Sequence, residues 1–281
     1  MNFDGFLSGD RSLKRLAVHT ITTKPWDIHT AISKYSAAGI GGISIWRDTL
    51  IGESLKQVRL EMDDVGLQPV ALVRGGFYTG RDKESRDLAV EDNLRAIDEA
   101  AAIGAPMIVL VCGATPGLSI AENVKQIRDG IERTLDHAAD AGVKLAIEPL
   151  HPMYADCRSA ISTLKSANDL CEAIDHPNLG VAVDVFHVWW DPDMEREVAR
   201  CGAADNVFGF HVCDWKLNMT DVLNDRGLMG EGIIDVKGIG AVVDRAGFDG
   251  FYEVEVFSTK WWSTDQDDYL KKIIKAYVDH C

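Results

Sequence analysis

The chain has 281 residues, of which 46% are apolar, and its formal net charge is −15. This length suits either one α/β barrel or two smaller domains. The negative charge repels phosphodiester backbones and no run of Lys or Arg offsets it, so nucleic acid is not an expected substrate.

The amino-terminal segment MNFDGFLSGDRSLKR mixes charged and apolar residues and does not read as a signal peptide. The sequence has no apolar run of 18 residues, so no membrane-spanning segment is expected. Its six cysteines are scattered and include no C-x-x-C pair, which is typical of reduced thiols. We therefore expect a soluble, cytoplasmic protein that does not bind membranes.

Apolar runs with β-strand character recur along the chain, separated by segments with helical spacing. The helical pattern is clearest at 87–104 and 119–142, where Leu88 and Ile120 begin the predicted apolar faces and Gly104 and Gly142 end the helices. The eight predicted strands cover 15–22, 41–47, 68–76, 106–113, 143–150, 179–187, 207–215 and 250–258.

The regular alternation of strands and helices predicts a parallel sheet covered by helices. Eight such units fit a single (β/α)8 TIM barrel, an α/β fold, and we expect one domain over residues 1–281. An open doubly wound sheet is the alternative. It is disfavoured because no G-x-G-x-x-G opens the first helix and no linker divides the chain.

Titratable side chains cluster where the last four predicted strands end, which in a barrel is one common mouth. They are Glu148 in AIEPLHP, Asp184 in VAVDVFH, His211 in GFHVCDW, and a glutamate pair in YEVEVFS. Because side chains alternate along a strand, the two glutamates of that pair point to the same side, and Glu255 lies nearer the rim.

Three carboxylates and one imidazole that converge on one point repel strongly unless a cation lies among them. Taken singly, each group also fits a helix cap, an ion pair or a buried histidine. Together they predict one divalent metal ion held by Glu148, Asp184, His211 and Glu255. This oxygen-rich set favours Mn²⁺, then Mg²⁺ or Co²⁺, with Zn²⁺ as a further alternative.

The motifs AIEPLHP, VAVDVFHVWW, GFHVCDW, DRGLMGEGIID and GFYEVEVFS resemble, in order and spacing, those of the xylose-isomerase-like TIM-barrel superfamily, also called the sugar phosphate isomerase/epimerase family. The resemblance covers nearly the whole chain. It implies that Glu148, Asp184, His211 and Glu255 are the metal ligands.

The resemblance also implies roles in catalysis and substrate binding. Glu148 and Glu255 would face opposite sides of a bound sugar as catalytic acid and base, and His187 and Arg226 match positions that contact substrate oxygens. The chain departs from the epimerases at EPLHP, where they tend to carry an asparagine-containing motif. This departure puts an additional titratable group, His151, near the mouth.

Tryptophans also follow the predicted strands. Trp46, Trp189 and Trp215 lie at strand ends or in the following loops, and indoles offer apolar faces to sugar C–H groups while their N–H groups can donate. Ordinary core or interface packing is the alternative for each of them. We predict that the three tryptophans contribute to a carbohydrate site.

These features predict a metal-dependent sugar isomerase or epimerase that acts on a ketose or keto-polyol through an enediolate. A close alternative is a lyase of the keto-inositol dehydratase or 3-keto-C-glycoside deglycosidase type, with His151 or His187 as acid or base. A non-catalytic sugar-binding protein is a further alternative. Endonuclease IV activity is not expected, because it needs many histidines and a basic face.

The expected partner is a small carbohydrate. Barrels of this kind often form homo-oligomers, but the sequence does not determine the oligomeric state.

Overall fold

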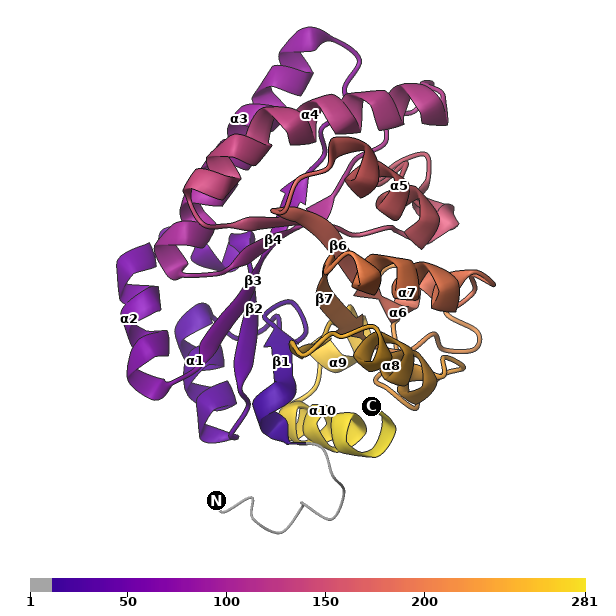
Figure 1. Cartoon of the computed structure of the whole chain (residues 1–281). Helices are drawn as coiled ribbons and strands as arrows, with labels where there is room; N and C mark the ends of the chain where they lie inside the picture. Colours follow the sequence, from indigo (N-terminus) through magenta and orange to yellow (C-terminus); the bar gives the residue numbers. More distant parts are fainter. Residues whose placement is uncertain (1–11) are drawn as a thin grey trace.

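The structure is a computed structural model that describes residues 12–281, so the first eleven residues of the predicted domain lie outside the described part. Eight parallel strands pair in sequence order and close into a barrel, with the last strand hydrogen-bonded to the first (Figure 1). The strands are β1 (Leu16–His19), β2 (Gly42–Trp46), β3 (Gln68–Gly76), β4 (Met107–Val111), β5 (Lys144–Ile147), β6 (Leu179–Asp184), β7 (Val207–Val212) and β8 (Tyr252–Val254).

Helices surround the barrel and cover the outer face of its strands (Figure 1). They are α1 (Ile28–Ala37), α2 (Leu55–Val65), α3 (Lys83–Ile103), α4 (Ile120–Asp140), α5 (Leu164–Ile174), α6 (Val185–Val188), α7 (Met194–Ala203), α8 (Val236–Arg245), α9 (Thr259–Trp262) and α10 (Gln266–His280), with short 3-10 turns η1 (Leu13–Arg15), η2 (Arg47–Leu50) and η3 (Pro152–Tyr154). This architecture is the predicted (β/α)8 TIM barrel. Among the described residues, no helix combines the length and the apolar character needed to cross a membrane.

All eight predicted strands are present, but most end earlier than the apolar runs suggested. Glu148 and Glu255 each follow the last residue of their strand directly, and His187 lies on α6 rather than on β6. The carboxylate of Asp184 explains the early end of β6, because it accepts a hydrogen bond of 2.8 Å from the N–H of Phe186. Asp184 thus caps α6 and turns the chain away from the strand direction.

The two long helices have the predicted type, but not the predicted buried faces throughout. Leu88 is 57% exposed and Ile120 is 52% exposed, whereas both were predicted to begin apolar faces. Each 21-residue helix is about 31 Å long, roughly twice the length of the five-residue strand β4. The two helices are therefore longer than the strand beside them, and Leu88 and Ile120, both near the amino-terminal ends of their helices, stay exposed.

Small side chains fill much of the barrel interior. The interior cluster includes Ala17, Ala71, Ala146 and Ala182, which are fully buried together with longer residues of β3 and β4. On β7, a Cβ added to Gly209 would lie 3.3 Å from Oε1 of Glu253. The small residues thus leave room on the barrel axis for the charged side chain of Glu253, directly below the candidate site.

The segment that follows β7 is held by Asp214, which is fully buried. Its two carboxylate oxygens accept four backbone N–H hydrogen bonds of 2.8–3.0 Å, from Trp215, Gly230, Gly232 and Ile234. This arrangement fixes residues 227–234 in a tight loop. The residue just before that loop, Arg226, is positioned through its backbone N–H, which donates to the carbonyl of Phe257.

Candidate active site

The four predicted ligand side chains meet at the carboxyl end of the barrel. Glu148, Asp184, His211 and Glu255 each offer one ligand atom, and these four atoms all lie within 4.8 Å of one another. None of the four residues is more than 5% exposed. They come from β6 and β7 and from the residues after β5 and β8, so four consecutive strands direct them to one point.

Two of these side chains contact each other directly. Nδ1 of His211 lies 2.8 Å from Oε1 of Glu148. Nη1 of Arg226 bridges the other two, at 3.2 Å from Oδ2 of Asp184 and 3.1 Å from Oε2 of Glu255. Arg226, which was predicted to bind substrate, is only 3% exposed. Its guanidinium instead donates hydrogen bonds to the carboxylates of Asp184 and Glu255.

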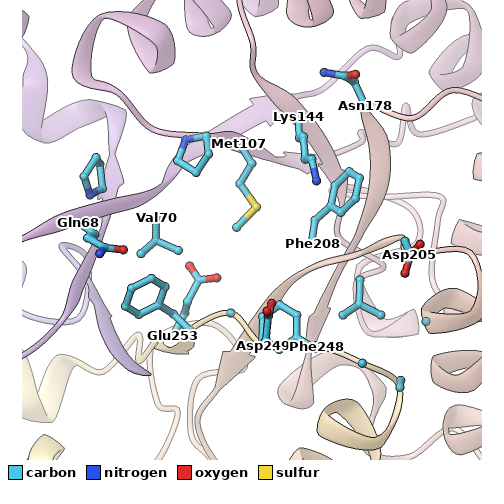
Figure 2. Close-up of a pocket in the computed structure, with 18 of the residues that line it drawn as sticks. Gln68, Val70, Met107, Lys144, Asn178, Asp205, Phe208, Phe248, Asp249 and Glu253 are labelled. Carbon is cyan, nitrogen blue, oxygen red and sulfur yellow. The ribbon is translucent and has the colours of Figure 1, made fainter. Parts of the chain in front are cut away.

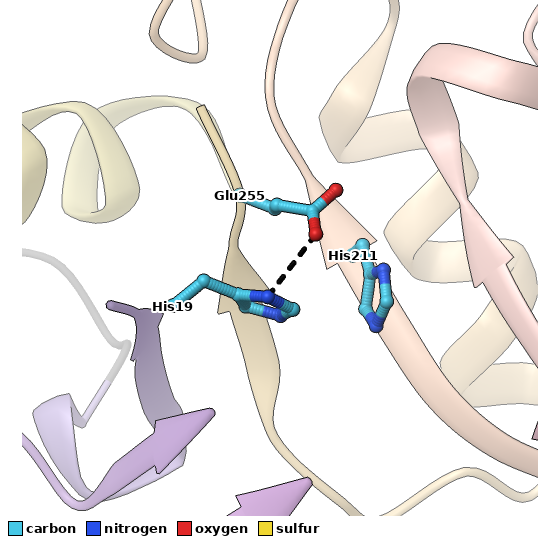
Figure 3. A group of neighbouring side chains, drawn as sticks. All are labelled: His19, His211 and Glu255. Carbon is cyan, nitrogen blue, oxygen red and sulfur yellow. Dashed lines mark ion pairs between the residues drawn. The ribbon is translucent and has the colours of Figure 1, made fainter. Parts of the chain in front are cut away.

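A second layer of polar side chains, His19, Ser44 and Glu253, lies deeper in the barrel. Of these, the sequence indicated only Glu253, as the deeper glutamate of the pair in YEVEVFS. His19, the last residue of β1, has Nδ1 3.2 Å from Oε1 of Glu255 (Figure 3). Its Nε2 lies 3.3 Å from Oε2 of Glu253. The hydroxyl of Ser44 donates a 2.5 Å hydrogen bond to the same Glu253 oxygen. The signal was available, because His19 lies near the carboxyl end of the predicted strand 15–22, as the four predicted ligands do in theirs.

His211 spans the two layers. Its Nε2 is buried without a hydrogen-bond partner among the described residues, and lies 3.9 Å from Oε2 of Glu253. Figure 3 shows the His211 ring beside His19 and below the carboxylate of Glu255; the two histidine ring centroids are 4.7 Å apart. His211 can therefore present Nδ1 to a cation while Nε2 faces an anionic acceptor, an arrangement common for histidine ligands.

Burial and neighbouring charges shift the protonation of this cluster. Burial raises the pKa of Asp184 to about 7, although the Arg226 guanidinium opposes the shift. Burial lowers the pKa of His211, but the carboxylates of Glu253 and Glu148 outweigh it and raise that pKa to about 10. Protons are therefore retained on groups that a metal would need in their deprotonated form.

The carboxylate of Glu255 has the opposite shift. Burial raises its pKa, but His19 and Arg226 outweigh burial and hold it well below the usual range. The pKa of His19 is lowered by burial and raised more strongly by Glu255 and Glu253, so the net shift is upward. Glu255 is thus ionised at neutral pH.

The charges of the cluster favour a bound cation. Four carboxylates, those of Glu148, Asp184, Glu253 and Glu255, are buried here with one permanent cation, Arg226. Burying unpaired carboxylates is costly unless protons or a metal compensate them. The donor set of carboxylate oxygens and one imidazole nitrogen fits a divalent ion such as Mn²⁺, Mg²⁺, Co²⁺ or Zn²⁺.

A narrow pocket opens above the cluster and holds five of the predicted site residues: Trp46, Glu148, His187, Arg226 and Glu255. The indole N–H of Trp46 points inward and lies 3.3 Å from Nδ1 of His19. The other lining residues are Val73, Val111, Leu150, Tyr154, Arg158, Leu223 and Phe257. The pocket therefore combines an acidic floor with aromatic and apolar walls, as expected for a small polar ligand.

His187 has a defined tautomer. Its Nδ1 accepts a 3.1 Å hydrogen bond from the backbone N–H of His151. Burial and the Arg226 charge lower its pKa well below the usual value, so the ring is neutral and carries its proton on Nε2. Nε2 lies 3.5 Å from Oδ2 of Asp184 and 3.3 Å from Nη2 of Arg226, and in this tautomer it cannot accept from the guanidinium.

Three predicted substrate-binding residues do not line this pocket. The half-buried His151 ring lies near Trp215, with centroids 5.0 Å apart, and Trp215 stacks on Phe186 at 4.8 Å. Trp189 lies 5.6 Å from Trp215. These rings form an aromatic layer beside the pocket, and direct contact with a substrate remains a prediction for them.

A larger cavity of about 540 Å³ lies at the opposite, amino-terminal end of the barrel. Figure 2 shows its lining, which includes Met107, Lys144, Phe208 and, from the barrel interior, the carboxylate of Glu253. The larger volume does not identify this cavity as the active site. The ligand cluster and the converging loops are at the carboxyl end, where barrel enzymes carry their chemistry.

The model of the xylose isomerase-like TIM barrel family matches residues 32–277. The chain belongs to this family. Its relatives include the inosose isomerase of Bacillus subtilis strain 168, which is 22% identical over 219 residues that cover 76% of each chain. The 3-dehydroshikimate dehydratase of Pseudomonas putida KT2440 is 24% identical over 232 residues, which cover 79% of this chain and 35% of the dehydratase.

Solved structures agree with this membership. The crystal structure of a protein from Sinorhizobium meliloti 1021 is 40% identical and covers 96% of this chain and 99% of its own, with a TM-score of 0.93. The IOLI protein with a zinc atom is 20% identical, covers 94% and 97%, and has a TM-score of 0.83. A D-psicose 3-epimerase is 16% identical, covers 94% and 96%, and has a TM-score of 0.78. The last two likenesses concern the fold. Known relatives of this family member thus include sugar isomerases and a dehydratase.

Proposed function

We propose that this chain is a divalent-metal-dependent isomerase or epimerase that acts on a ketose or keto-polyol through an enediolate. The observation that carries the proposal is the convergence of Glu148, Asp184, His211 and Glu255, buried at the base of a pocket, within 4.8 Å of one another. The relationship to inosose isomerases supports a polyol with a carbonyl group as the substrate class.

Glu148, Asp184, His211 and Glu255 would hold the cation. When bound, a divalent cation supplies Lewis-acid polarisation of a carbonyl, which acidifies the adjacent C–H group. Glu148 and Glu255 both line the pocket and come from β5 and β8, on different sides of the mouth. One carboxylate can therefore remove a proton from one face of the substrate while the other returns a proton to the opposite face.

Isotope exchange tests the proposal. The protein is stripped with a chelator, reloaded with Mn²⁺, Mg²⁺, Co²⁺ or Zn²⁺, and incubated with ketoses and inososes in D₂O. We expect metal-dependent uptake of deuterium at the carbon beside the carbonyl, without loss of water. NMR and mass spectrometry measure this uptake. Glu148→Gln and Glu255→Gln should lower the exchange rate by about 10²- to 10⁴-fold.

Glu132→Gln is the matched control, because this glutamate is 46% exposed on α4 and pairs only with its helical neighbour Arg128. It should exchange at the wild-type rate. An absence of metal-dependent exchange with all carbonyl polyols would contradict the proposed isomerase. A third outcome would identify a sugar-binding protein. In that case the wild-type protein binds these polyols but does not convert them, and Glu148→Gln and Glu255→Gln bind them equally well.

A dehydratase or other lyase is the second candidate, and His187 favours it. The neutral His187 ring lines the pocket and carries its proton on Nε2, so it can donate a hydrogen bond to the oxygen of a leaving hydroxyl or aglycone. The proton that Glu148 takes from the substrate carbon can then pass to that oxygen as its bond to carbon breaks. The relationship to a 3-dehydroshikimate dehydratase points the same way. If the product is consistently lighter than the substrate by water or an aglycone, and His187→Asn no longer forms it, the protein is a lyase and not an isomerase.

A further inference from the structure

Two arginines at the mouth of the barrel differ from the other arginines that the structure describes. Among residues 12–281, the side chains of Arg74 and Arg158 form no ion pair and no hydrogen bond, although acids exceed bases by a net charge of 15. Arg47, by contrast, binds both Asp92 and Glu99. In a chain with this excess of acidic residues, an arginine without an acidic partner is unexpected, which suggests that its partner is a ligand.

Both arginines lie beside the pocket above the ligand cluster. Arg158 lines the pocket directly, and Arg74 packs on Phe77, which packs against the pocket-wall cluster of Val111, Leu150 and Tyr154. Each is half-buried and packs on an aromatic ring: Cζ of Arg74 lies 4.3 Å from the ring centroid of Phe77, and Cζ of Arg158 lies 5.7 Å from that of Tyr154. Each guanidinium is therefore supported by a ring, while its N–H groups have no acceptor among the described residues.

The two rings belong to one structural unit. Phe77 and Tyr154 pack on the same small apolar cluster, which contains Val111 and Leu150 of the pocket wall. The pairing of β3 with β4 is irregular between Val73 and Gly75, so the chain is displaced at Arg74. These features bring arginines that are distant in sequence to one side of the pocket.

The two positive charges influence each other. The pKa of Arg74 is lowered from its usual value by burial and then by the nearby charge of Arg158. An anion placed between or beside the two groups would relieve this repulsion and supply the missing hydrogen-bond acceptors. A guanidinium fork fits the oxygens of a carboxylate or a phosphate particularly well.

We propose that Arg158 and Arg74 bind an oxyanion, a carboxylate or phosphate carried by the substrate at the end remote from its reacting carbonyl. This inference rests on the proposed function and narrows it, because the net charge alone favours neutral sugars. Arg226 does not serve this purpose, since Asp184 and Glu255 already neutralise it.

The test compares three sugars that differ only at C6: D-fructose, D-fructuronate and D-fructose 6-phosphate. Their affinities for the Mn²⁺-loaded protein are measured by isothermal titration calorimetry. At least one anionic sugar should bind about 10- to 100-fold more tightly than fructose, because charge-assisted hydrogen bonds are the strong ones. Whether fructuronate or the 6-phosphate binds more tightly identifies the group.

Arg158→Gln and Arg74→Gln should remove most of that advantage and leave fructose affinity within about two-fold of wild type. Arg158→Lys, which keeps the charge but not the fork, should retain part of it. Arg95→Gln is the matched control, because Arg95 is 61% exposed on α3, and it should change nothing. Folding of each variant is checked by its melting temperature.

The inference is wrong if no anionic sugar binds more tightly than fructose, or if Arg158→Gln weakens fructose and the anionic sugars equally. Failure of the proposed function is a separate result, read from deuterium exchange. Metal-dependent exchange on uncharged ketoses without an anionic preference would overturn only the arginine inference. Arginine-dependent binding of an anionic sugar without exchange would overturn only the isomerase.

Discussion

Single residues beneath the ligand cluster determine how the ligands are held. Glu253 is fully buried, and one of its oxygens accepts from Ser44 and faces His19 and His211. The negative charge of this carboxylate, 3.9 Å from Nε2 of His211, favours the tautomer that carries a proton on Nε2 and leaves Nδ1 facing the cluster. The nearby contact between His19 and Glu255 can orient a second ligand in the same way.

Glu253→Gln should therefore weaken metal binding without removing a ligand. We expect the dissociation constant for Zn²⁺ or Mn²⁺ to rise about 10- to 100-fold, as for other residues that support histidine ligands. Competition against a fluorescent chelator measures it. The exposed control Glu132→Gln should keep wild-type affinity. An unchanged dissociation constant in Glu253→Gln would show that this carboxylate does not position His211.

At the scale of elements, the loop after β7 carries Arg226 to the site, and Asp214 holds that loop through four backbone hydrogen bonds. Asp214→Asn replaces one acceptor oxygen by an NH₂ group that faces two N–H donors. We expect the free energy of unfolding to fall by about 2–5 kcal/mol, because buried donors lose their acceptors. Urea denaturation measures the loss.

Asp136→Asn on the exposed side of α4 is the control for this prediction and should change stability by about 0.5 kcal/mol or less. Metal affinity provides a second readout, since a loosened loop should let Arg226 leave Asp184 and Glu255. Wild-type stability in Asp214→Asn would mean that the loop is held by its other contacts.

The sequence was sufficient to predict the elements and the barrel, because strand runs and helical spacing alternate eight times. Pattern alone could not give the depth of each side chain. Side-chain alternation in YEVEVFS predicted Glu253 one repeat below Glu255. The contacts of Glu253 and the place of His19 follow only from strand register, which pairs His211 with both Asp184 and Glu253. Likewise, Trp189 follows β6 in the sequence, yet it lies beside the pocket because α6 turns the chain away, and Trp215 packs near it.

At the scale of the whole molecule, the buried cluster links stability to pH. The metal-free pKa values of Asp184 and His211 are raised to about 7 and about 10, from ordinary values of 3.8 and 6.5. The folded chain thus holds more protons than the unfolded chain, so the free energy of unfolding falls as pH rises. The loss spans about pH 4–7 for Asp184 and about pH 6.5–10 for His211.

The metal-free protein should therefore melt at a higher temperature at about pH 6 than at about pH 9. Glu253 and Glu255 have lowered pKa values, so their contribution is complete above about pH 4.5 and does not change in this range. Excess Mn²⁺ should raise the melting temperature most at the higher pH, because the metal displaces protons. His211→Asn should flatten the metal-free profile; an unaltered slope in that variant would contradict the assignment to His211.

The most direct test of the central claim is the stoichiometry of metal binding to the chelator-stripped protein, measured by titration with Mn²⁺ and Zn²⁺. Glu148, Asp184, His211 and Glu255 should together bind one divalent ion per chain, and Asp184→Asn or His211→Asn should abolish that binding while the barrel stays folded. Failure of the wild-type protein to bind either ion, or full binding by both variants, would contradict the account.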